Sequence, residues 1–178
     1  HADTNSMWGM IVSGINATDA GTPVQLIYAG TSIKTKATNA DQTTALVATS
    51  PATIFAAIKD PDRLARWWGP SGFSNAFETF DFRPGGRWVF SMIGPDGKTY
   101  PNEAVFAVID ADRQIVIDHV SQPHFVLTIT LEAASVGTRV SWVQTFADAA
   151  VAEAVRHVCE PANEQNLDRL SVEVLGPA

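Results

Sequence analysis

The sequence predicts an α+β fold, in which a curved antiparallel sheet of about six to seven strands wraps around a long C-terminal helix. Six runs with two-residue alternation lie between residues 76 and 146, separated by turn residues at roughly 8–12-residue spacing. Two short apolar stripes at helical spacing precede these runs, and a helical pattern closes the chain. The strand–helix–strand alternation of parallel sheets does not occur.

The first strand is expected at Thr43–Thr49, and two short helices follow it. Ser50-Pro51 and Asp60-Pro61 each join a capping side chain to a proline that suits the first helical position. Gly69-Pro70 ends the second helix. The buried positions are expected to be Ile54, Phe55 and Ile58 in the first helix and Leu64, Trp67 and Trp68 in the second.

The six alternating runs predict the rest of the sheet. They are Ala76–Arg83, Arg87–Ile93, Ala104–Ile109, Gln114–Val120, Phe125–Leu131 and Thr138–Phe146. Successive side chains of a strand point to opposite faces. Glu78 is therefore expected on one face with Phe80 and Phe82.

The tail is expected to be helical over Ala149–Cys159 and Ala162–Leu175. Pro161 lies between these two patterns, and it either kinks one long helix or starts a new one.

Residues 1–42 are expected to form an extension to a main domain at residues 43–178. His1–Ser6 is a candidate tag remnant, and Met7–Ile15 with Val24–Ala29 is a candidate hairpin. The polar stretch Thr31–Gln42 is typical of a linker.

Composition excludes several classes of protein. The 178 residues are 46% hydrophobic and 17% charged, so a disordered chain is excluded. The net charge of −7 disfavours nucleic acid and anionic membranes as partners. No apolar run reaches the roughly 18 residues of a spanning helix. The single cysteine, Cys159, excludes an internal disulfide, and a cytoplasmic location is expected.

Several motifs occur together in a recognisable order. Arg66-Trp67-Trp68-Gly69-Pro70 comes first, Asp81-Phe82-Arg83-Pro84-Gly85-Gly86-Arg87-Trp88 follows, and Gly94-Pro95-Asp96-Gly97 with Tyr100 comes third. From Thr43 to Leu175 the chain resembles bacterial proteins similar to the C-terminal domain of the activator of Hsp90 ATPase. These proteins belong to the START-like, helix-grip superfamily. The closing run from Pro161 to Leu170 resembles their terminal helix.

The resemblance implies an apolar cavity between the sheet and the long helix, and it implies no catalytic residue. A small hydrophobic or aromatic ligand is the expected partner. The aromatic and apolar residues expected to line the cavity or fill the core are Trp67, Trp68, Phe80, Trp88, Phe90, Met92, Phe125 and Trp142.

Three polar residues share strand faces with apolar ones. Glu78, His119 and Gln144 are candidates for orienting a ligand from inside the cavity. If at least two of these polar groups converge inside the cavity, an alternative hypothesis is an enzyme of the cyclase or hydrolase type, with an inward Glu78 beside an inward His119 as a candidate acid–base pair. Local hydrogen bonding or a solvent-facing position is the competing interpretation of each.

No metal or cofactor is expected. His119, His124 and His157 are scattered, and no HxH or HExxH motif occurs. A co-chaperone role on Hsp90 is disfavoured, because 42 residues are too few for the separate domain that carries much of that engagement in eukaryotic activators. An edge strand or the N-terminal run could pair two copies into a homodimer.

Overall fold

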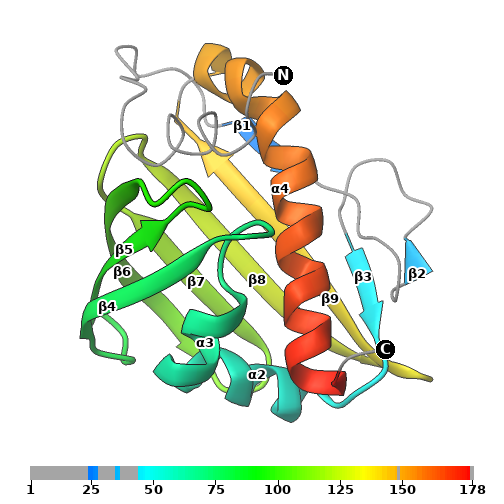
Figure 1. The fold of residues 1–178 in the computed structure, drawn as a ribbon. Helices are drawn as coiled ribbons and strands as arrows, with labels where there is room; N and C mark the ends of the chain where they lie inside the picture. The colour runs from blue at the N-terminus through cyan, green and yellow to red at the C-terminus, as the bar shows by residue number, and fades with distance from the viewer. Residues whose placement is uncertain (1–23, 28–34, 37–43, 148, 177–178) are drawn as a thin grey trace.

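The protein folds as one antiparallel sheet around a long helix (Figure 1). The structure is a computed structural model, and it describes residues 24–27, 35–36, 44–147 and 149–176. The strands lie in the order β2-β3-β9-β8-β7-β6-β5-β4, and β1 also pairs with β9. The strands are β1 (Val24–Ile27), β2 (Thr35–Lys36), β3 (Thr44–Val47), β4 (Ser74–Phe80), β5 (Arg87–Ile93), β6 (Thr99–Asp110), β7 (Gln114–His119), β8 (Phe125–Ala134) and β9 (Gly137–Phe146).

The helices are α2 (Pro51–Lys59), α3 (Pro61–Trp67) and α4 (Ala149–Leu175). α4 crosses the sheet, and α2 and α3 pack against it near its C-terminal end (Figure 1). The α+β fold class is confirmed, with seven strands from β3 to β9 and two short helices after β3. Among the described residues, no helix combines the length and apolarity needed to span a bilayer.

The two predicted helix starts are confirmed. The Ser50 side chain accepts a hydrogen bond from the Thr53 amide at 3.2 Å. The Asp60 carboxylate accepts one from the Asp62 amide at 2.9 Å. These bonds satisfy amides that have no partner inside the helix.

α4 is a single helix that contains Pro161. Both Pro161 and His157, whose carbonyl loses its helical donor, lie on the exposed side of α4, so that carbonyl can bond to water. Cys159 and Ala162, which flank the proline, are fully buried. Packing on both sides of Pro161 therefore favours one continuous helix.

The N-terminal expectations are only partly described. Met7–Ile15 lies outside the described residues. Val24–Ile27 pairs with Val143–Phe146 of β9, and β2 lies within the expected linker.

A partly buried arginine fixes α4 to the segment that joins α3 to β4. The Arg169 guanidinium donates, at 2.6–3.0 Å, to the carbonyl oxygens of Arg66, Trp68, Gly69, Pro70 and Phe73. Burial lowers the pKa of Arg169, but the carbonyl dipoles replace the water that the charge loses.

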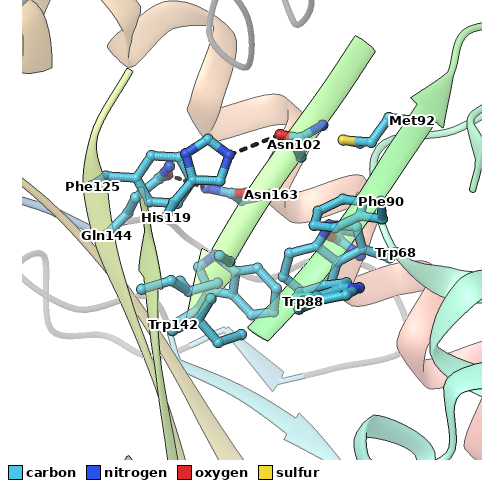
Figure 2. A pocket seen from close by; sticks show the side chains of 14 residues that line it. Trp68, Trp88, Phe90, Met92, Asn102, His119, Phe125, Trp142, Gln144 and Asn163 are labelled. Atoms are coloured by element: carbon cyan, nitrogen blue, oxygen red, sulfur yellow. Dashed lines mark hydrogen bonds between the residues drawn. The ribbon is translucent and has the colours of Figure 1, made fainter. Parts of the chain in front are cut away.

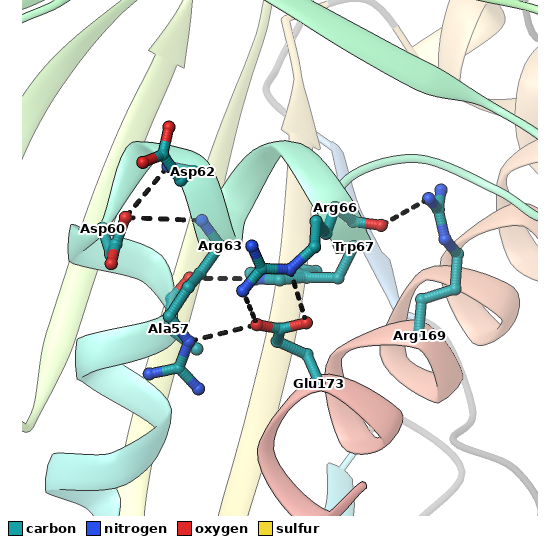
Figure 3. A network of polar contacts seen from close by, with 8 residues as sticks. All are labelled: Ala57, Asp60, Asp62, Arg63, Arg66, Trp67, Arg169 and Glu173. Atoms are coloured by element: carbon teal, nitrogen blue, oxygen red, sulfur yellow. Dashed lines mark hydrogen bonds and ion pairs between the residues drawn. The ribbon is translucent and has the colours of Figure 1, made fainter. Parts of the chain in front are cut away.

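The neighbouring contacts repeat this attachment. Asn166 of α4 donates to the Trp67 carbonyl at 2.8 Å, and Asn75 of β4 donates to the Trp68 carbonyl at 2.9 Å. One turn further along α4, Glu173 accepts hydrogen bonds from Arg63 and Arg66 of α3 (Figure 3). The Trp67-Trp68 motif and the closing run from Pro161 to Leu170 are therefore joined by hydrogen bonds.

A tight turn joins β4 to β5. A Cβ at Gly86 would overlap the carbonyl oxygen of Asp81, whereas the space around Gly85 is open and its φ is +81°. Gly85 donates to the Phe106 carbonyl at 2.7 Å, and Gly86 accepts from the Phe106 amide at 2.9 Å. The turn is thereby bonded to β6.

We expect Arg169→Met to lower the free energy of unfolding by about 2–4 kcal/mol, because it removes five hydrogen bonds and the donor to the part-buried carbonyl oxygens of Gly69 and Phe73. Arg156→Met is the matched control, since the ion pairs of Arg156 within the described residues are with Glu153 and Glu160 of the same helix; it should change that free energy by less than about 1 kcal/mol. Urea unfolding measures both. Equal losses would contradict the role given to Arg169.

The two turn glycines provide a second pair of variants to compare. Gly86→Ala should lower the free energy of unfolding by about 2–4 kcal/mol, since the backbone around Asp81 must move. Gly85→Ala should cost about 1–2 kcal/mol, the strain of a left-handed alanine. Thermal and urea unfolding compare the two variants. A larger loss of stability for Gly85→Ala would contradict the close approach of Gly86 to the Asp81 carbonyl.

Candidate functional site

A small cavity lies between the sheet and α4 (Figure 2). Its volume is about 30 Å³, which is room for about one or two water molecules. All the lining residues are buried, and Trp68 and Phe125 are the most exposed at 8%. The lining consists of Trp68, Trp88, Phe90, Met92, Asn102, Ala104, Ile117, His119, Phe125, Leu127, Trp142, Gln144, Asn163 and Asn166.

Most of the candidate site residues lie in this lining. The structure brings together Trp68, Trp88, Phe90, Met92, His119, Phe125, Trp142 and Gln144. Trp67, Phe80 and Glu78 lie elsewhere. Trp67 is buried, and its indole nitrogen donates to the Ala57 carbonyl at 3.0 Å. Phe80 is half-buried, stacked between Phe77 and Phe82.

The expected inward position of Glu78 is wrong, because Glu78 is exposed. The pairing of β4 with β5 shifts between Phe77 and Thr79, which marks a bulge at Glu78. A bulge inserts one extra residue and breaks the alternation of faces. Phe77 therefore stacks with Phe80 at 5.6 Å between ring centroids, and the Glu78 side chain points to solvent.

The sequence reasoning missed several lining residues. They are Asn102, Ala104, Ile117, Leu127, Asn163 and Asn166. A signal for Asn102 was present, since it alternates in phase with Ala104 and Phe106 in β6. Asn163 and Asn166 share a helical face with Leu167 and Leu170, so the same spacing that identified the buried face of α4 also indicated them.

One end of the cavity is aromatic. Trp68 packs edge-on against Trp88 at 5.0 Å and lies 5.7 Å from Trp142, between ring centroids. Trp88 stacks on Phe90 at 4.1 Å. The buried indole N–H of Trp88 has no acceptor among the described residues. It is a hydrogen-bond donor left over in an apolar setting.

The other end is polar. His119 stacks on Phe125 at 4.4 Å, and its Nε2 lies 2.8 Å from Asn102 Oδ1. Nearby, the Asn163 side chain of α4 donates to Gln144 Oε1 at 3.2 Å (Figure 2). Burial lowers the pKa of His119 from 6.5 to about 4, so the imidazole is neutral at pH 7.

This arrangement offers hydrogen bonds, not an acid–base pair. The lining contains no carboxylate, and Glu78 does not reach His119. Within the described residues, no three histidine, cysteine, aspartate or glutamate side chains are grouped to hold a metal ion.

The antiparallel sheet around α4, with α2 and α3 inserted after the first strand of the core, defines an α+β helix-grip protein of the START-like type. The sequence profile of the family "Activator of Hsp90 ATPase homolog 1-like protein" matches residues 48–174. The chain belongs to this family.

Solved structures with the same fold are distant in sequence. A protein from Chromobacterium violaceum is 23% identical with a TM-score of 0.68, over 77% of this chain and 97% of that one. A protein from Nitrosomonas europaea is 17% identical with a TM-score of 0.70, over 88% and 96%. The AHSA1 protein from Silicibacter pomeroyi is 17% identical with a TM-score of 0.63, over 75% and 96%. The comparison with curated proteins gives no match.

Acid should destabilise the protein through His119. The unfolded chain binds this proton near pH 6.5 and the folded protein only near pH 4. The contribution of neutral His119 to the free energy of unfolding is therefore complete above pH 6.5 and is lost as the pH falls toward 4. Over that interval it amounts to about 3 kcal/mol. Between pH 7 and pH 5 the wild type should lose about 2 kcal/mol more than His119→Gln. Urea unfolding at both pH values measures this difference, and parallel pH profiles would contradict it.

Proposed function

We propose that the chain binds a compact small molecule, with an aromatic or other apolar body and one hydrogen-bond acceptor, in the cavity between the sheet and α4. The observation that carries the proposal is the unpartnered Trp88 N–H in an aromatic lining. Buried donors nearly always have partners, and a ligand oxygen or nitrogen would supply one here. The indole rings offer large contact areas to the ligand body.

Binding requires the cavity to expand, because pockets that hold small molecules measure about 300–1,000 Å³ and this cavity measures about 30 Å³. Met92 suits that change, because its flexible side chain lines the cavity and adapts to irregular spaces.

Ligand binding accounts for the site better than the other two hypotheses do. The enzyme hypothesis rested on polar side chains that converge inside the cavity; His119 and Gln144 line it, but Glu78, the carboxylate of the acid–base pair, is exposed. The Hsp90 role suggested by the family name would use an exposed surface. The unpartnered Trp88 N–H and the His119–Asn102 hydrogen bond are buried.

Toluene and indole are suitable probes for the apolar body of the ligand, and acetophenone adds a hydrogen-bond acceptor for the Trp88 N–H. A bound probe should quench the tryptophan fluorescence, because Trp68, Trp88 and Trp142 line the cavity. At a probe concentration of ten times the dissociation constant, the melting temperature should rise by about 3–6 °C. No response to any apolar or aromatic probe, neutral or acidic, would contradict the proposal.

Ala104→Val places a larger side chain in the cavity from β6, so probe binding should weaken at least tenfold. Its free energy of unfolding should change by no more than about 2 kcal/mol, since the added methyl groups enter free space. Ala107→Val is the matched control on the same strand, because Ala107 is exposed; it should leave binding unchanged. Equal binding by both variants would place the probe elsewhere.

A further inference from the structure

The polar end of the cavity holds a row of hydrogen-bonding groups that ends on two backbone carbonyls. Asn102 Nδ2 donates to the Tyr100 carbonyl at 2.8 Å. Asn102 Oδ1 lies 2.8 Å from His119 Nε2 (Figure 2). His119 Nδ1 lies 3.0 Å from the Pro123 carbonyl. The row therefore runs from one carbonyl to another through an amide and an imidazole.

A neutral imidazole leaves this row one hydrogen short, because it carries one N–H and both its nitrogens face oxygen acceptors. A proton on Nδ1 leaves Nε2 facing Asn102 Oδ1, and a proton on Nε2 leaves Nδ1 facing the Pro123 carbonyl. Turning the Asn102 amide moves the mismatch to the Tyr100 carbonyl. Ser121 Oγ, 3.3 Å from Nε2, can donate to it but does not remove the facing amide oxygen. An imidazolium satisfies every group in the row.

The surroundings of His119 explain why the proton is missing. Burial holds its pKa at about 4, and no other lining residue is titratable. The nearest charged groups act weakly and in opposite senses, since Asp118 raises the pKa of His119 and His124 lowers it. Asp118 itself pairs with His124 at 2.6 Å in an exposed position. What the cavity lacks is a negative charge to accompany the proton.

We infer that the ligand is a compact weak acid, bound as its anion together with one proton that His119 takes up. The inference rests on the proposed function and specifies the ligand class. The anion enters a cavity that has no carboxylate to repel it, and the Trp88 N–H is available to one of its oxygens. The imidazolium then completes the row between Tyr100 and Pro123 and balances the ligand charge.

No covalent bond forms or breaks in the ligand. The carboxylate comes from solution, and the proton comes from water or buffer and is retained on the ring until the ligand leaves. The complex is then neutral overall within the cavity, which lowers the cost of burying the anion.

Benzoate and benzamide test the inference, because they share a shape and differ in charge. Benzoate should bind the wild-type protein and take up about one proton, measured by calorimetry in two buffers of different ionisation enthalpy. Its dissociation constant should rise about tenfold from pH 5 to pH 6, as one linked proton requires. Benzamide binding should not change with pH.

The outcomes separate the two proposals. Binding of toluene or benzamide without benzoate overturns the acid inference and leaves the ligand-binding proposal standing. Benzoate binding without proton uptake also overturns the inference. No binding of toluene, indole, acetophenone, benzamide or benzoate overturns both.

Variants locate the proton. His119→Gln should abolish the uptake, whereas His124→Gln, which removes the neighbouring exposed ring, should preserve it. If His119→Gln does not fold, imidazole NMR signals of the wild-type protein give the same answer, since the His119 ring should change to its cationic form on adding benzoate at pH 6. Uptake that persists in His119→Gln, or a wild-type ring that stays neutral, overturns the inference.

Discussion

The partly buried charge of Arg169 is the constraint on which the rest of the site depends. A guanidinium that loses part of its water needs hydrogen-bond acceptors, and it finds them in the carbonyl groups of the segment between α3 and β4. These carbonyls can converge on it only if the backbone turns around the guanidinium, which fixes where Trp68 leaves the chain. The position of the cavity wall made by Trp68 therefore depends on Arg169, which does not itself line the cavity.

Much of the fold could be predicted because local chemistry determines it. Ser50-Pro51 and Asp60-Pro61 set the helix starts without help from the rest of the protein. β5 has the same bounds in the structure as in the prediction, since its alternation is clean and turn residues flank it. Pro161 could not be resolved from the sequence alone, because packing at Cys159 and Ala162 decides whether the helix continues.

The site was less predictable than the fold, for identifiable reasons. Alternation placed His119 and Gln144 inside correctly, because β8 pairs with β7 and with β9 without a shift. It failed at Glu78, since the bulge depends on how β4 pairs with β5 and not on the residues of β4 alone. Asn102 was missed because the predicted strand began at Ala104, whereas β6 begins at Thr99. The row through Asn102 and His119 joins residues of two strands, and no single-strand pattern reports it.

The pairing of β1 has a consequence for shortened forms of the chain. β3 occupies one stretch of the free edge of β9, at Thr138–Ser141, and β1 occupies the next, at Val143–Phe146. Without β1, that second stretch would present unused amide and carbonyl groups beside the sheet. Such an unpaired strand edge is a template to which another polypeptide can add a strand. Truncation that removes β1 therefore opens this stretch of β9 to strand addition by another copy of the chain.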